Sequence, residues 1–154
     1  MAMISAIPDG WKTILIVDDD PFLTDYVSLL LRRASYRTMV ANDAQAGLDA
    51  AKKCGPDGIL LDLTMPDVDG FAFLERKRGM AGIAGIPVIV LSAAHRDQDV
   101  QLALKFGARG YVTKPVDDIV LLARLERLVP SPLYGRRPST RVTWHTTGAR
   151  TLLR

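Results

Sequence analysis

Cysteine is almost absent from this sequence, and long apolar runs are missing altogether. One cysteine, Cys54, occurs among 154 residues, so no internal disulfide can form and a reducing compartment is indicated. No apolar run approaches the roughly 20 residues that a membrane-spanning helix needs. The first 12 residues hold Pro8, Asp9 and Gly10 where a signal peptide would need a basic start and an apolar run. We therefore expect a cytoplasmic protein with no membrane partner.

The sequence also lacks a P-loop motif, and its charge is unevenly distributed. No G-x-x-x-x-G-K-S/T pattern occurs. Residues 1–129 hold 15 Lys and Arg against 17 Asp and Glu, whereas residues 130–154 hold five Arg and no acid. Five scattered arginines with one Trp are thin support for nucleic-acid binding, so we do not expect a nucleic-acid partner. We divide the chain into an N-terminal extension (1–12), a folded domain (13–129) and a basic tail or linker (130–154) that we expect to be disordered.

What the sequence does contain is an alternation of expected strands and helices. Short apolar runs are typical of strands covered on both faces, and the half-polar run at 37–41 suits an edge strand. The expected strands are 14–17, 37–41, 58–61, 88–91 and 111–112. The expected helices begin at Pro21, after Asn42 or Asp43, at Phe71, at Asp97, and at Asp117 or Asp118. Five such pairs predict an α/β fold, a doubly wound open parallel sheet with strand order 2-1-3-4-5.

Polar residues follow these expected strands at the point where each one ends. Asp18 and Asp19 come directly after the first strand, Asp62 after the third, Ser92 after the fourth and Lys114 after the fifth. Because the carboxyl ends of parallel strands share one edge of the sheet, these five side chains are expected to converge.

Several carboxylates in one place repel one another, and this repulsion indicates a bound cation. Carboxylates a few ångströms apart repel one another, and a hard divalent cation such as Mg²⁺ relieves that repulsion. A lysine and a hydroxyl beside the metal would suit a phosphoryl group during transfer. Asp62, alone at the end of the central strand, is the natural nucleophile. Asp20, in contrast, precedes Pro21 and is expected only to cap a helix.

Four motifs in order resemble the receiver domain of two-component response regulators. They are VDDDP at 17–21, LLDLTMPDVDG at 60–70, VIVLSA at 88–93 and GARGYVTKP at 107–115. Asp62 and Ser92 are 30 residues apart, and Ser92 and Lys114 are 22 apart. The resemblance covers residues 13–129 and implies a flavodoxin-like fold and a phosphoacceptor in a two-component phosphorelay.

The resemblance also implies a metal site. Asp62 would accept a phosphoryl group from a histidine kinase or a histidine phosphotransfer protein. Asp19 and Asp62 would bind Mg²⁺ directly, with Mn²⁺ as a substitute, and Asp18 would act through a coordinated water. The backbone carbonyl of Thr64 would complete the protein's share of the ligands; many receivers have Asn at this position.

A switch is the third implication of the resemblance. Ser92 and Lys114 would hold the phosphoryl oxygens, and Ser92 would move together with Tyr111 on phosphorylation. Pro115 resembles the family's cis-proline. The surface made by the fourth helix, fifth strand and fifth helix would then change its affinity for a downstream protein, or for a second copy of the chain in a homodimer.

Two alternatives remain beside a receiver that acts alone. The chain would also suit a fragment of a larger regulator or hybrid kinase. An enzyme of another class, a phosphohydrolase with an aspartyl-phosphate intermediate, would carry a second acid two residues after its nucleophile. Thr64 stands at that position. We therefore expect a phosphoacceptor with slow self-dephosphorylation and not a turnover enzyme.

Overall fold

A computed structural model describes residues 9–65, 70–93 and 96–132. The expected extension up to residue 8 and the expected tail from residue 133 lie outside this part of the chain. The strands are β1 (Lys12–Val17), β2 (Tyr36–Ala41), β3 (Gly58–Asp62), β4 (Val88–Ser92) and β5 (Gly110–Thr113). The helices are α1 (Pro21–Arg33), α2 (Ala44–Cys54), α3 (Gly70–Arg78), α4 (Asp97–Lys105) and α5 (Asp118–Leu128).

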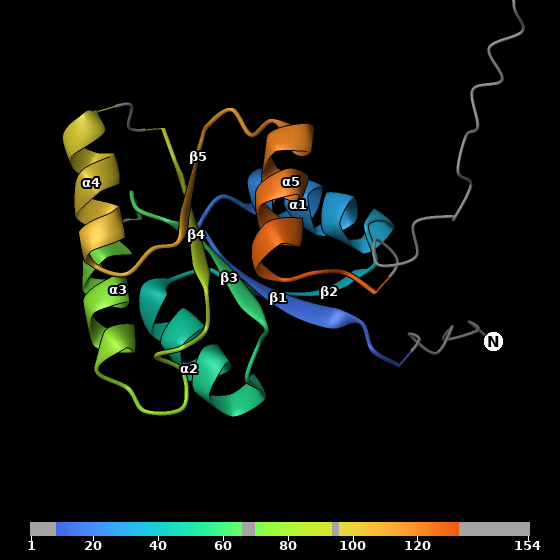
Figure 1. Cartoon of the computed structure of the whole chain (residues 1–154), viewed down its shortest axis with the longest axis horizontal. Coiled ribbons are helices and arrows are strands. Elements are labelled where there is room, and N and C mark those ends of the chain that lie inside the picture. The colour runs from blue at the N-terminus through green and yellow to red at the C-terminus, as the bar shows by residue number, and fades with distance from the viewer. Residues whose placement is uncertain (1–8, 66–69, 94–95, 133–154) are drawn as a thin grey trace, which may run out of the picture.

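The five strands form one parallel sheet in the order β2-β1-β3-β4-β5, which confirms the predicted α/β fold (Figure 1). Helices cover both faces of the sheet, as the apolar strand runs require. On one face α1 and α5 pack over residues such as Ile16 and Leu60, and on the other α2, α3 and α4 pack over Leu15 and Leu61. No described helix is long and apolar enough to cross a membrane.

The strands extend one or two residues beyond their apolar runs. β1 begins at Lys12 because backbone pairing with β2 continues through Lys12↔Tyr36 and Thr13↔Arg37, although Lys12 and Thr13 are not buried. Hydrophobicity reports burial and not backbone pairing, so the polar ends of a strand are missing from a prediction based on apolar runs.

Aspartate caps explain where three of the helices begin. Asp20 accepts hydrogen bonds from the backbone N–H groups of Phe22 and Leu23 at 3.0 and 3.3 Å. Asp43 caps α2 and Asp117 caps α5, which decides between the two candidates that the sequence offered for each helix. Asp20 and Asp117 lie in the turns after β1 and β5, where the polar residues of interest lie.

The last described residues are packed against the start of β2. The Tyr36 hydroxyl donates to the carbonyl oxygen of Val129 at 2.7 Å, and the Ser131 hydroxyl donates to the carbonyl oxygen of Ala34 at 3.1 Å. Ser131 is buried, although we expected the tail to begin at residue 130. The packed part of the chain therefore reaches at least Ser131.

Candidate functional site

Three carboxylates gather where β1 and β3 end. Asp18 and Asp19 follow β1, and Asp62 is the last residue of β3. The two strands are neighbours with Val17 opposite Leu61, so the next positions along each strand face one another. One carboxylate oxygen from each of the three residues lies within 4.8 Å of the others. Asp18 and Asp62 are buried, at 1% and 2% exposure, whereas Asp19 is exposed to solvent.

Lys114 reaches this acidic cluster from the end of β5. Its Nζ lies 2.9 Å from Asp18 Oδ2 and 3.5 Å from Asp62 Oδ1. Its backbone N–H donates to the carbonyl oxygen of Ser92 at 2.9 Å, which links the ends of β4 and β5. The following peptide bond, Lys114–Pro115, is cis, as the resemblance to receiver domains implied. The fold thus brings residues from 96 positions apart in the sequence into direct contact.

The charge of the cluster is not balanced by the protein alone. Burial raises the pKa of Asp18, and the negative charge of Asp62 raises it further. A hydrogen bond from the Asp20 backbone N–H and the ammonium of Lys114 oppose that rise in pKa. Three carboxylates face one ammonium, so an excess of negative charge remains. A divalent cation with oxygen ligands fits this donor set.

Thr64 positions the Asp62 carboxylate. Its backbone N–H and its hydroxyl both donate to Asp62 Oδ1, at 3.1 and 3.0 Å. With Lys114 also near Oδ1, this oxygen is held by three groups, whereas Oδ2 has no hydrogen-bond partner among the described residues. The use of the Thr64 carbonyl as a metal ligand stays a prediction.

Ser92 and Tyr111 lie on the same face of the sheet. Ser92 ends β4, is fully buried and is paired in register with Thr113. Tyr111 is two residues earlier on β5, half-buried, and packs against the apolar cluster beneath α2, α3 and α4. Because alternate residues of a strand share a face, Ser92 belongs to the face of Val90, which is Tyr111's neighbour in register. Their joint movement stays a prediction.

Gly70 lies beside the backbone of Asp62, and although it ends the motif at 60–70, no role was expected for it. It begins α3, and its backbone N–H donates to the Leu63 carbonyl oxygen at 3.2 Å. A Cβ at this position would lie 2.6 Å from Leu63 Cα and 2.8 Å from the Asp62 carbonyl oxygen. The backbone that carries Asp62 therefore has room only for glycine at position 70. No apolar pattern or charge signals such a contact.

Comparisons with known proteins agree with this geometry. The family model of the response regulator receiver domain matches residues 14–126. The DNA-binding dual master transcriptional regulator RpaA of Synechocystis sp. is 42% identical over 75% of this chain and 48% of its own length. An uncharacterized 14.6 kDa protein of Leptolyngbya boryana is 34% identical over 74% of this chain and 87% of its own length.

Solved structures show the same likeness. The chemotaxis protein CheY4 of Vibrio cholerae matches with a TM-score of 0.73 and 29% identity, covering 77% of this chain and 99% of CheY4. The chain spans about half the length of the first curated regulators that it matches, such as RpaA and the DNA-binding response regulator MtrA of Mycolicibacterium smegmatis.

Proposed function

The chain belongs to the response regulator receiver domain family, and from this premise we propose that it is a phosphoacceptor whose acceptor residue is Asp62. Receiver domains serve two-component signalling and interact with histidine kinases or histidine phosphotransfer proteins, and such a protein would be the donor here. The observation that carries the proposal is the position of Asp62: a buried carboxylate between a lysine and two further acids.

The chemistry is an in-line transfer to a carboxylate. Asp62 Oδ2, the oxygen without a partner among the described residues, attacks the phosphorus of the donor's phosphohistidine. The new P–O bond forms as the P–N bond breaks, and the released imidazole takes up a proton. Thr64 holds the other oxygen still, and the Lys114 ammonium faces the negative charge of the transferring group.

A divalent metal fits the same cluster. Asp19 and Asp62 would hold Mg²⁺ or Mn²⁺ with the Thr64 carbonyl, and Asp18 would act through a water molecule. The ion would supply charge stabilisation for the equatorial oxygens of the phosphoryl group. The excess of carboxylates over ammonium groups is the observation that supports this assignment.

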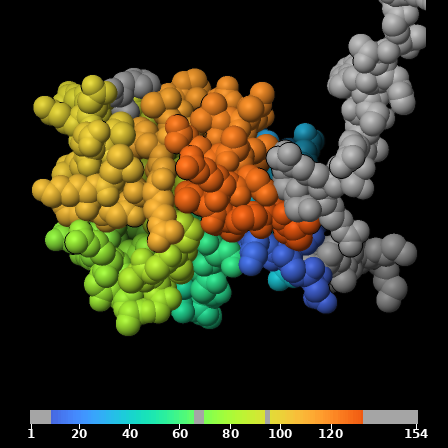
Figure 2. Space-filling view, in the orientation of Figure 1, coloured from blue at the N-terminus to red at the C-terminus, as the bar shows by residue number. Residues whose placement is uncertain are grey.

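The readout is the surface of α4, β5 and α5, which Figure 2 shows across the front of the molecule. Ser92 would turn toward the phosphoryl oxygens, and Tyr111 would move into the space released. Exposed apolar side chains on α4 and α5, including Leu102, Leu104 and Ile119, offer this surface apolar contacts for a partner. A downstream protein is the proposed occupant, and a second copy of the chain is the other one.

The two alternatives differ in their support. Because this chain spans about half of several DNA-binding regulators, we also consider it the receiver part of a longer regulator, with the same role for Asp62. A phosphohydrolase is less well supported, since the Thr64 hydroxyl contacts Asp62 where such an enzyme needs an acid. We expect slow loss of the phosphoryl group from Asp62 and no sustained turnover.

Labelling with acetyl phosphate and Mg²⁺ tests the proposal. The parent protein should gain one phosphoryl group, measured by intact mass, and Asp62→Asn should gain none. Asp57→Asn is the matched control, because Asp57 precedes the same strand at its other end and is half-exposed. A labelled Asp62→Asn protein, or a parent that stays unlabelled, would contradict the proposal. Continuous release of inorganic phosphate would favour the phosphohydrolase.

A further inference from the structure

A cavity of about 590 Å³ opens at the start of β1 and β2. Its walls include Trp11, Thr13, Arg32, Arg37, Thr38 and Met39. Thr13 is near the beginning of β1, whereas the acidic cluster follows the end of the same strand. The cavity is therefore separate from the phosphoacceptor site, and no part of the proposed function uses it.

Arg37 is one of the lining residues, and one of its donors has no acceptor among the described residues. Its Nε is shielded from water and has no hydrogen-bond partner among the described residues. A guanidinium stays charged in proteins, and leaving one of its buried N–H groups without an acceptor is costly. The Arg37 guanidinium is therefore not fully paired by the described residues.

Arg32 adds a second cation. It lies in the last turn of α1, and its Nε donates to the Thr38 hydroxyl at 3.2 Å, which holds the guanidinium beside β2. No carboxylate is among the residues that line the cavity. Two guanidinium groups without an acid favour a ligand that carries a carboxylate or a phosphate, because both accept paired hydrogen bonds from arginine.

The rest of the lining is largely apolar. Trp11 and Met39 form part of the wall, and the volume lies within the range typical of sites for small organic molecules. A bare inorganic ion would leave this apolar surface uncovered. An indole side chain favours an aromatic or similarly flat apolar group against its ring.

We propose that this cavity binds a small organic oxyanion, with Arg32 and Arg37 holding its charged group and Trp11 contacting its apolar body. A carboxylate and a phosphate monoester share the chemistry that the two arginines recognise. Binding should not depend on Asp62, which lies at the opposite edge of the sheet.

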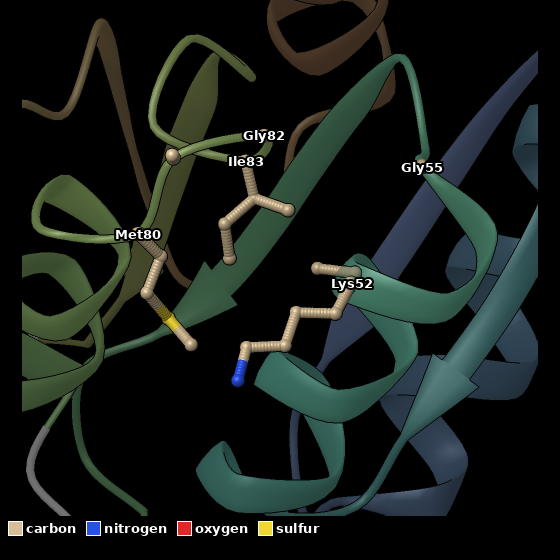
Figure 3. A pocket seen from close by; sticks show the side chains of 7 residues that line it. Lys52, Gly55, Met80, Gly82 and Ile83 are labelled. Atoms are coloured by element: carbon tan, nitrogen blue, oxygen red, sulfur yellow. The ribbon is translucent and has the colours of Figure 1, made fainter.

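A second cavity has no arginine among the described residues that line it and serves as a comparison. It has a volume of about 380 Å³ and lies between α2 and the loop before β4. Figure 3 shows its one cationic side chain, Lys52, reaching toward Met80 from the opposite wall. None of its described lining residues carries a buried polar atom without a partner. We assign no ligand to it, and Lys52→Met serves as a control below.

Calorimetry and tryptophan fluorescence test the proposed site on the full chain. The sequence has two tryptophans, so Trp144→Phe leaves Trp11 as the only indole reporter. Benzoate and phenyl phosphate are the probes, and at least one should bind saturably and change the Trp11 emission. Arg37→Met and Arg32→Met should each weaken binding about tenfold or more. Arg33→Met, an exposed neighbour outside the lining, and Lys52→Met should keep the parent affinity.

The outcomes separate the two ligand types and the two proposals. Binding of benzoate alone, phenyl phosphate alone, or both supports the site and names its anion. Inorganic phosphate binding as tightly as phenyl phosphate would overturn the role of the apolar wall. No saturable binding of either probe, or parent affinity in both arginine variants, would overturn the proposal. Asp62→Asn should bind the probes as the parent does, so failure of the phosphoacceptor assignment leaves this test intact.

Discussion

The two ends of β1 carry charges in very different surroundings. At its carboxyl end, Lys114 pairs with Asp18, and their side chains are 21% and 1% exposed. At its amino end, Lys12 lies 3.8 Å from Asp57, and their side chains are 46% and 40% exposed. Both are Lys–Asp pairs within one sheet. Their difference in burial teaches that solvent access, and not residue type, sets how much each pair matters to the protein.

Removing the lysine from each pair should give the largest difference between the two ends. Lys114→Met leaves two buried carboxylates without their ammonium, so we expect the free energy of unfolding to fall by about 2 kcal/mol at neutral pH. Lys12→Met removes an exposed partner and should change that free energy by less than about 0.5 kcal/mol. Urea unfolding without divalent cations measures both values.

Added Mg²⁺ sharpens this result. If the cation takes over the neutralising role of Lys114, added Mg²⁺ should stabilise Lys114→Met by more than it stabilises the parent, whereas Lys12→Met should gain only as much as the parent. An equal loss of unfolding free energy in Lys114→Met and Lys12→Met would contradict the greater importance of the buried pair.

Metal binding at the acidic cluster should stabilise the folded chain by a smaller amount. At a Mg²⁺ concentration ten times the dissociation constant, the folded chain gains about 1.4 kcal/mol, which thermal unfolding detects as a rise in Tm. Asp19→Asn should remove that rise. Asp20→Asn is the matched control, because Asp20 caps α1 and Asn caps helices equally well. A Tm rise that survives in Asp19→Asn would exclude Asp19 as a ligand.

Removing a buried lysine that has no carboxylate partner in the described part of the chain should have a smaller effect than removing Lys114. Lys77 is buried and donates to the Ala84 carbonyl oxygen at 2.9 Å. Burial lowers the pKa of Lys77, and the positive charge of Arg109 lowers it further. Lys77→Met should therefore change the free energy of unfolding at neutral pH by less than about 1 kcal/mol, in contrast to Lys114→Met.

The lowered pKa of Lys77 also predicts how the stability difference between the parent and Lys77→Met changes with pH. The unfolded chain binds a proton at Lys77 more tightly than the folded chain does. The parent should therefore gain stability relative to Lys77→Met as the pH rises through the lowered pKa toward the ordinary lysine value of 10.5. Paired unfolding curves between neutral and alkaline pH measure this difference. A constant difference across that range would contradict the burial of a charged ammonium.

The features that could be predicted from the sequence are those marked by residues close together along the chain. Apolar runs located the five strands, and aspartates such as Asp43 located the helix starts. The acidic cluster followed from a general rule, because residues after parallel strands share an edge. Contacts that depend on exact distances in space had no such signal: Gly70 against the backbone of Asp62, and the unpaired Nε of Arg37.

The anchoring of Ser131 has a consequence for how this domain is joined to anything else. Its hydroxyl donates to the Ala34 carbonyl oxygen, beside the start of β2, so the last described residues lie at the amino ends of the strands. A module joined after residue 132 would therefore be attached at the amino ends of the strands, whereas Asp62 lies at the carboxyl end of β3. Phosphorylation of Asp62 could therefore affect such a module only through a change in the packing of the domain, because the point of attachment does not contact the acceptor site.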